Sequence, residues 1–118
     1  MSSEKVVLGY WGIRGLGQIP RLLLAYTGAN WEDVKYVGRE QWHEKDKKDL
    51  GLDFPNLPYL IEGDFKITES RAVNLYIISR SDKKDLLGKN IKDQAVVEQI
   101  IGVLNDVRTP VSGLLFDK

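Results

Sequence analysis

The sequence predicts one α/β domain followed by a further long helix. Stretches of strand character alternate with stretches of helical spacing, in the order strand, helix, strand, weak helix, two strands, helix. A chain of 118 residues buries roughly two thirds of its unfolded surface, which suffices for one core but not comfortably for two. An apolar helical pattern begins again near Ile91, after a polar connector. We therefore expect one domain with an appendage.

The first strand and helix occupy the opening stretch of the chain. An apolar, β-branched run from Val6 to Leu8 leads into Tyr10 and Trp11, as in a buried strand. After a glycine-rich bend, apolar residues recur at helical spacing at Ile19, Leu22, Leu23 and Tyr26. Pro20 falls in the first turn of this helix, where its missing N–H costs little, and Gly28 is the expected C-cap.

A second strand, a weak helix and a hairpin follow. The stretch WEDVKY sets Trp31, Val34 and Tyr36 against polar neighbours, as a strand does. The stretch EQWHEKDKKDLG is charged and stops at a glycine, so we expect at best a short, exposed helix. The stretch LPYLIEGDFKI predicts two short strands, at 59–61 and 65–67, joined by a Glu-Gly-Asp turn.

Two helices complete the chain. Ser70 can cap a third helix, whose inward residues include Val73, Tyr76 and Ile77. The last helix has a wide apolar face, made by Val96, Val97, Ile100, Ile101, Val103, Leu104 and Val107. Such a face indicates a partner helix. Pro110 should bend or stop this helix because it cannot donate to the carbonyl of Asp106.

Composition excludes several classes of function. Lys and Arg total 17, as do Asp and Glu, so no net charge favours nucleic acid, an anionic membrane or an acidic partner. The sequence has no cysteine, which removes disulfides, thiolate zinc sites and a cysteine nucleophile. If thiol chemistry occurs, the sulfur arrives with the substrate. No stretch is apolar enough for a secretory signal or a membrane span, so we expect a soluble, cytoplasmic protein.

Metal and nucleotide sites are also disfavoured. His43 is the only histidine, so we expect no metal site and no Ser-His triad, and we expect His43 to be exposed. The bend GLGQIP lies between a strand and a helix, as a dinucleotide fingerprint does, but Pro20 stands where that fingerprint needs a glycine. We therefore expect no nucleotide cofactor.

The motif FPNLPYL has a functional and a structural interpretation. A cis Leu57-Pro58 bond would leave backbone polar groups at a sheet edge, available to an extended peptide. The spacing alone favours an ordinary loop proline by about two to one, because only about 5 to 6% of X-Pro bonds in folded proteins are cis.

Two further motifs could hold charged ligand groups. In ITESRA, Glu69 and Ser70 at a helix start suit an ammonium and a carboxylate, although the motif considered alone favours a plain helix cap. Trp42 could bind a second carboxylate together with neighbouring lysines, although charged runs are more often solvated surface. These lysines are Lys45, Lys47 and Lys48.

The segments GYWGIRGLGQIPRLLLAY, LGLDFPNLPYLIEG and KITESRAVNLYI together resemble the amino-terminal domain of cytosolic glutathione transferases, most closely the mu class. The resemblance covers essentially the whole chain. It implies a thioredoxin-like fold with a four-stranded mixed sheet over residues 1–82. It also implies that residues 83–118 are a linker and the first helix of an all-helical domain, which would account for the wide apolar face.

The resemblance implies a site for glutathione as co-substrate, without a metal. In this family the tripeptide lies along the edge before the cis-proline, and its thiol meets a tyrosine hydroxyl at the end of the first strand. Here that residue is Tyr10, the expected catalytic residue, which would donate a hydrogen bond to the sulfur anion. The expected glutathione contacts are Tyr10, Trp11, Leu16, Trp42, Lys47, Asn56, Leu57, Pro58, Glu69, Ser70 and Asp106.

The implied roles divide these residues among the parts of the tripeptide. Trp42 and Lys47 match positions for the glycine carboxylate. Leu57, flanked by Asn56 and Pro58, matches the backbone pair for the cysteinyl unit. Ser70 matches the residue that binds the γ-glutamyl carboxylate. Asp106, in LNDVR, matches an aspartate that reaches the partner subunit's glutathione.

The sequence departs from the mu pattern at three places. Glu69 replaces a glutamine, although a carboxylate can still accept from an ammonium. One extra residue lies between Trp42 and Gly51, so Lys47 matches when counting back from the glycine, and Lys45 remains an alternative. The family continues beyond the position of Lys118 through helices that build the electrophile pocket. We therefore expect either a portion of a longer protein or a chain of compromised activity.

The resemblance implies conjugation of the glutathione thiolate to small, apolar electrophiles, a detoxification reaction, by a protein that is a homodimer at full length. Two alternatives stay open. The first is a non-catalytic interaction or dimerisation module, which the wide apolar face of the last helix would suit. The second is a glutathione-dependent isomerase on the same scaffold.

Overall fold

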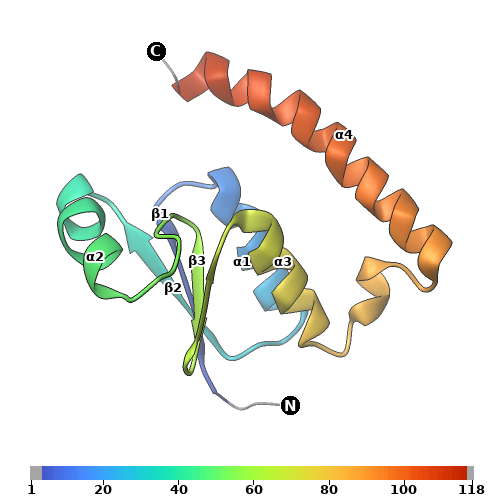
Figure 1. The fold of residues 1–118 in the computed structure, drawn as a ribbon, viewed down its shortest axis with the longest axis horizontal. Coiled ribbons are helices and arrows are strands. Elements are labelled where there is room, and N and C mark those ends of the chain that lie inside the picture. Colours follow the sequence, from blue (N-terminus) through green and yellow to red (C-terminus); the bar gives the residue numbers. More distant parts are fainter. Residues whose placement is uncertain (1–3, 117–118) are drawn as a thin grey trace. The chain divides into compact units, whose positions relative to one another are not determined.

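The computed structural model describes the backbone of residues 4–116 and the side chains of residues 4–114. Contacts within the chain divide it into two units, and the boundary in the sequence lies between Lys83 and Lys84 (Figure 1). The first unit contains the sheet and the helices packed on it. The second unit contains a short 3₁₀ turn, η3 (Lys84–Leu87), and one long helix, α4 (Ile91–Phe116).

The first unit is built on a four-stranded mixed sheet in the order β2-β1-β3-β4. Strand β1 pairs in parallel with β2 and antiparallel with β3, which pairs antiparallel with β4. The strands are β1 (Val6–Trp11), β2 (Trp31–Tyr36), β3 (Tyr59–Glu62) and β4 (Phe65–Thr68). A helix connects β1 to β2 because parallel strands need a crossover, whereas the tight turn between β3 and β4 makes a hairpin. The predicted thioredoxin-like element order is confirmed.

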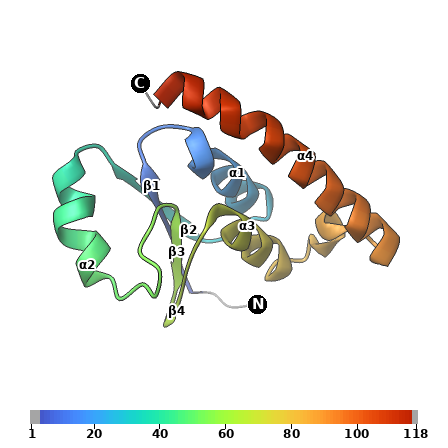
Figure 2. The same cartoon turned by 45° about the horizontal axis from the view of Figure 1, so that its top comes forward.

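Helices lie on both faces of this sheet (Figure 2). Helices α1 (Gln18–Tyr26) and α3 (Ser70–Ser79) cover one face, and the segment of η2 (Glu40–Asp46) and α2 (Lys47–Asp49) lies toward the other. A short turn, η1 (Gly15–Gly17), leads into α1. The core under α1 and α3 consists of Val6, Leu8, Leu24, Leu60, Val73 and Ile77. A second, mostly aromatic core consists of Tyr10, Tyr36, Trp42, Leu52, Leu57 and Tyr59.

The buried face of α1 differs from the predicted one. The side chains of Ile19, Leu22 and Tyr26 are 55, 55 and 62% exposed, whereas Pro20 and Leu24 are buried. Of the predicted set only Leu23 packs against the core. The helix is apolar almost all round from position 19 to position 24, so helical spacing alone could not select the face. After the C-cap at Thr27, Gly28 has a φ of +71°, the left-handed conformation that favours glycine there.

Two further features of the first unit differ from the prediction, the N-cap of α3 and the burial of Trp42. Helix α3 begins at Ser70 itself, its N-cap is Glu69, and no side chain caps it by a hydrogen bond; Val73 and Ile77 are buried as predicted. The charged stretch expected to be a short, exposed helix forms η2 and α2, and Trp42 within it is only 2% exposed. A single large aromatic residue thus anchors an otherwise charged segment.

In the second unit, the expectation that Pro110 stops the last helix was wrong, whereas a bend there stays a prediction. Helix α4 continues through Pro110 to Phe116. Proline removes one backbone hydrogen bond, but the helical bonds on either side are independent of it, and the Thr109 hydroxyl donates to the Asn105 carbonyl at 3.0 Å in the adjoining turn. The apolar side chains of α4 are largely exposed, for example Ile100 and Val107 at 53 and 60%. In the part of the chain that the structure describes, no helix is both long and apolar enough to span a membrane.

Candidate functional site

Tyr10 lies at the end of β1 beneath the glycine-rich bend. Its hydroxyl oxygen accepts a hydrogen bond from the Leu16 N–H at 3.0 Å, and the residue is only 6% exposed. A Cβ on Gly15 would lie 2.5 Å from the hydroxyl oxygen, and one on Gly17 would lie 2.5 Å from Cδ2. The glycines therefore let the bend approach the ring closely. Among the hydrogen bonds of the described residues, none uses the Tyr10 proton, so the hydroxyl retains its capacity to donate.

The edge at the start of β3 contains a hydrogen-bonded chain of three residues. The Leu57-Pro58 peptide is cis, so the preference from spacing for an ordinary proline was wrong, and the expectation from the resemblance is confirmed. Both residues are buried. The Leu57 N–H donates to Asn56 Oδ1 at 2.9 Å, and the Asn56 amide donates to Glu69 Oε2 at 3.3 Å. These contacts connect the edge to the start of α3.

Glu69 has an unusual backbone conformation. Its φ is +77°, and no other non-glycine residue in the described part of the chain has a positive φ. For a residue with a Cβ this conformation is strained, and such strain gathers at functional sites. The first N–H groups of α3 follow directly, and the Glu69 carbonyl accepts from the Val73 N–H at 2.9 Å. The side chain of Glu69 is exposed and that of Ser70 is half-buried, so both can meet a ligand.

An aromatic and carboxylate network joins β2, β3 and η2. The Tyr36 hydroxyl donates to Asp46 at 2.6 Å and lies 2.8 Å from the Tyr59 hydroxyl. Since Tyr36 has one proton, Tyr59 is the donor in the second bond. Burial and the hydrogen bond to Asp46 raise the pKa of Tyr36 well above its usual range, and burial raises the pKa of Tyr59. Trp42 stacks on Tyr59 with ring centroids 5.9 Å apart.

The segment between Trp42 and Gly51, in which the sequence departs from the mu pattern, contains a π-type turn. Segment η2 is a π-helix, and the Lys47 N–H bonds to the Trp42 carbonyl, five residues back. Such turns insert one residue into a helix without interrupting it, frequently at functional sites. The π-type bond joins position five to Trp42 as an α-helical bond joins position four, so Lys47 comes one turn after Trp42. Lys47 is therefore in phase with Trp42, and Lys45 is not; both are exposed.

The remaining expected residues lie in different places. Trp11 and Leu16 are half-buried, and Trp11 borders a hollow of about 340 Å³ lined by Trp11, Gly12, Ile13, Tyr36 and Val37. His43, expected to be exposed, is half-buried against Trp11, with ring centroids 5.8 Å apart. Asp106 is exposed on α4, in the second unit. Within the described part of the chain, no group of three or more His, Cys, Asp or Glu residues could hold a metal ion.

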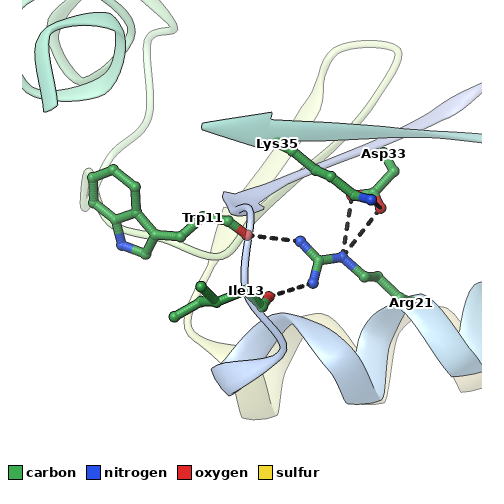
Figure 3. A network of polar contacts seen from close by, with 5 residues as sticks. All are labelled: Trp11, Ile13, Arg21, Asp33 and Lys35. Atoms are coloured by element: carbon green, nitrogen blue, oxygen red, sulfur yellow. Dashed lines mark hydrogen bonds and ion pairs between the residues drawn. The ribbon is translucent and has the colours of Figure 1, made fainter. Parts of the chain in front are cut away.

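Sequence analysis missed Arg21, which contacts the bend beside Tyr10. Its guanidinium donates to the Trp11 and Ile13 carbonyls and to Asp33 (Figure 3). The available signal was a lone cation in an otherwise apolar helix, because an arginine is almost never fully buried unless it is paired. The Tyr36 and Asp46 pair was also missed, because its members are ten residues apart and only the turn of η2 brings them together.

Comparison with known proteins identifies the family of this chain. The family model for the glutathione S-transferase N-terminal domain matches residues 6–79. The chain is 43% identical over 114 residues to the class-mu 26 kDa isozyme of Schistosoma japonicum, covering 95% of this chain and 50% of that protein. It is 43% identical over 120 residues to glutathione S-transferase Mu 2 of Homo sapiens, covering 95% and 53% of the two chains.

Among solved structures, that of the glutathione S-transferase Blo t 8 superposes with a TM-score of 0.81 at 33% identity, covering 93% of this chain and 50% of that one. The chain thus spans about half the length of the relatives that it matches. The family model covers most of the first unit, including strand β1 with Tyr10 and the edge from Asn56 to Ser70. The chain therefore belongs to the glutathione S-transferase family, of which it contains the N-terminal domain.

Proposed function

We propose that this chain binds glutathione along the edge formed by η2, Leu57 and the start of α3, and that it is the glutathione-binding part of a transferase. The observation that carries the proposal is the Tyr10 hydroxyl. Its oxygen accepts from the Leu16 N–H at 3.0 Å, which polarises the O–H bond, because hydrogen bonds in a chain strengthen one another. The proton is then well suited to be donated to a sulfur anion.

One hydrogen bond of this kind is large enough to activate a thiol. A thiol with a pKa of about 8.5 is only about 3% ionised at pH 7. Lowering that pKa by about two units makes roughly three quarters of it thiolate and requires about 2.7 kcal/mol. A charge-assisted hydrogen bond supplies about 1.5 to 3 kcal/mol. The thiolate becomes somewhat less nucleophilic, but with a Brønsted slope near 0.4 to 0.5 the gain in its population prevails.

The two zwitterionic ends of glutathione fit the two ends of the edge. At the start of α3, the free N–H groups and the Ser70 hydroxyl suit the γ-glutamyl carboxylate. One oxygen of Glu69 accepts from Asn56, and the other can accept from the ammonium group. At η2, the Lys47 ammonium, in phase with Trp42, suits the glycine carboxylate. Between them, the cysteinyl carbonyl of glutathione would replace the Asn56 oxygen on the Leu57 N–H.

The reaction that we propose is attack of the thiolate on an electrophilic carbon of an apolar compound. A sulfur–carbon bond forms, the leaving group departs with its electron pair, and the thiol proton has already passed to solvent. Tyr10 stabilises the nucleophile, and the residues at both ends of the edge orient it, which is where effective molarity is gained. We further propose that the whole protein acts in the cytoplasm as a homodimer, in keeping with the lack of cysteine and the resemblance to the mu class.

Titration of bound glutathione in the ultraviolet tests this function. In the unaltered chain we expect the thiol pKa of bound glutathione to fall by about two units, and in Tyr10→Phe we expect it to return toward about 8.5, because the donated hydrogen bond is lost. The Tyr26→Phe variant is the control, since Tyr26 is 62% exposed on α1. An unshifted thiol in the unaltered chain would contradict the proposal.

A non-catalytic interaction module is the second candidate, favoured by the exposed apolar side chains of α4. Retention on immobilised glutathione separates the two functions. A glutathione-binding chain should be retained and then released by free glutathione, whereas a pure interaction module should pass through the column.

A further inference from the structure

Arg21 connects three segments of the first unit around the bend. Its Nη2 donates to the Trp11 carbonyl at 2.8 Å and its Nη1 to the Ile13 carbonyl at 2.6 Å. Its Nε lies 3.2 Å from the Asp33 carboxylate on β2 (Figure 3). The Arg21 side chain is only 11% exposed. A largely buried cation with three defined acceptors is far more constrained than a surface ion pair.

The two carbonyls lie where the strand becomes the bend. The Gly12 N–H still donates to the Tyr36 carbonyl at 2.9 Å, so pairing with β2 continues through Gly12 and ends there. The carbonyls on either side of Gly12 are the ones that Arg21 binds. A guanidinium holds two carbonyls in one plane because its N–H groups form a rigid fork, whereas a lysine ammonium is a point charge on a flexible stem. Arg21 therefore fixes the direction in which the chain leaves β1.

The bend fixed in this way supplies the hydrogen bond on Tyr10. Three residues after Ile13, the Leu16 N–H reaches the Tyr10 hydroxyl oxygen. Gly15 and Gly17 lie against the same ring with no room for a Cβ. The Arg21 guanidinium carbon also lies 5.7 Å from the centroid of the Tyr10 ring. The same side chain thus contacts the bend above the tyrosine and the face of the tyrosine itself.

We infer that Arg21 is a positioning residue, which holds the Leu16 N–H on the Tyr10 oxygen by binding the Trp11 and Ile13 carbonyls. The orientation of the Tyr10 proton toward a ligand then depends on a residue that touches no ligand. This inference about the bend comes from the geometry alone; its consequence for the glutathione thiol rests on the proposed function. Asp33 neutralises the Arg21 charge and so allows the guanidinium to lie largely buried between helix α1 and strand β2.

Hydrogen exchange of the Leu16 amide tests the inference without any ligand. We compare Arg21→Met and Arg21→Lys with Arg80→Met. Arg80 is a matched control because it is also a shielded ion-paired arginine, with a side chain 15% exposed and bonded through two nitrogens to Glu62, at the far end of α3. The buried amide of Leu60 in β3 reports global stability in each variant. These choices separate opening of the bend from a general loss of stability.

In Arg21→Met, exchange at Leu16 should accelerate by about tenfold or more relative to Leu60, because the bend is no longer fixed. In Arg21→Lys the acceleration should be intermediate, since an ammonium can satisfy one carbonyl but not both. In Arg80→Met the ratio of the Leu16 and Leu60 rates should match that of the unaltered chain. A ratio in Arg21→Met and Arg21→Lys that equals the ratio in Arg80→Met would overturn the inference.

A second measurement extends the test to glutathione. If the unaltered chain lowers the thiol pKa of bound glutathione, Arg21→Met should raise that pKa by about one unit, whereas Arg80→Met should leave it unchanged. A bound thiol that titrates alike in Arg21→Met and the unaltered chain would contradict the consequence for the thiol. If the unaltered chain itself fails to shift the thiol, the proposed function fails, and the exchange ratio still decides the role of Arg21.

Discussion

At the scale of single residues, the site depends on its glycines as much as on its larger side chains. Tyr10 can lie beneath the bend only because positions 15 and 17 carry no Cβ. Gly15 has a φ of +37°, which favours glycine on conformational grounds as well. Gly17 has a φ of −85°, which any residue adopts, so its requirement is purely steric.

Gly17→Ala should therefore destabilise the first unit by about 1 to 3 kcal/mol, because the new methyl group would overlap the Tyr10 ring. The free energy of unfolding in urea measures this loss. Gly38→Ala is the control, since nothing lies within 4 Å of a Cβ at position 38. Equal stability of the two variants would show that the bend can move away from the ring.

Tyr36 carries the second residue-level prediction. Its pKa and that of Tyr59 are raised in the folded chain, whereas in the unfolded chain both titrate near pH 10. Above about pH 10 the unfolded chain loses protons that the folded chain keeps, so the free energy of unfolding should fall as the pH rises, with a limiting slope of about 1.4 kcal/mol per pH unit for each tyrosine that stays protonated in the folded chain. Below that pH this contribution is fully present.

Urea unfolding between pH 8 and pH 11 checks this expectation. Tyr36→Phe should lose about 1 to 3 kcal/mol at pH 8, because Asp46 and Tyr59 each lose a hydrogen-bond partner. Above pH 10 its stability should fall less steeply, because one raised pKa is gone. Tyr26→Phe, on an exposed part of α1, should follow the unaltered chain; a parallel decline in Tyr36→Phe would contradict the argument.

At the scale of elements, the π-type turn of η2 decides which lysine lies one turn from Trp42. The π-type turn moves Lys47 into line with Trp42 and turns Asp46 toward Tyr36. The π-type turn thus favours Lys47 over Lys45 as the residue for the glycine carboxylate.

Lys47→Met should weaken glutathione binding about fivefold, since an exposed charge-assisted contact is worth about 1 kcal/mol, whereas Lys45→Met should change it less than about twofold. Titration calorimetry measures both affinities. Glutathione with an esterified glycine carboxylate is the control ligand, because it should bind Lys47→Met and the unaltered chain equally. A larger effect at Lys45 would reverse the assignment.

At the scale of the whole molecule, the first unit carries every feature of the proposed glutathione edge except Asp106. All three tryptophans, Trp11, Trp31 and Trp42, also belong to it. Tryptophan fluorescence during unfolding should therefore report this unit. Glutathione at about 100 times its dissociation constant should add about 2.7 kcal/mol to the free energy of unfolding followed by fluorescence. Cysteinylglycine, which lacks the γ-glutamyl group, should add much less to the free energy of unfolding. If it stabilises the chain as much as glutathione does, the start of α3 does not bind the γ-glutamyl group.

The sequence predicted the order of strands and helices because alternation, turn residues and capping positions are local signals. It could not predict which face of α1 is buried, because Ile19 and Leu24 are equally apolar. It could not predict the contacts of Arg21 either, because these join segments that only the parallel pairing of β1 and β2 brings together. It also could not predict that α4 continues through Pro110, because proline alone does not decide between a kinked helix and an ended one.

The hydroxyl and carboxylate chain through Tyr36, Asp46 and Tyr59 has an evolutionary consequence. Tyr59 directly follows Pro58, and Asp46 directly precedes Lys47. One chain of hydrogen bonds therefore connects the two segments that would bind the tripeptide, the edge at Pro58 and the segment at Lys47. Replacing any one of the three leaves the hydrogen-bonding groups of its partners unsatisfied. Among related sequences, positions 36, 46 and 59 should therefore covary, so that all three residues change together or none does.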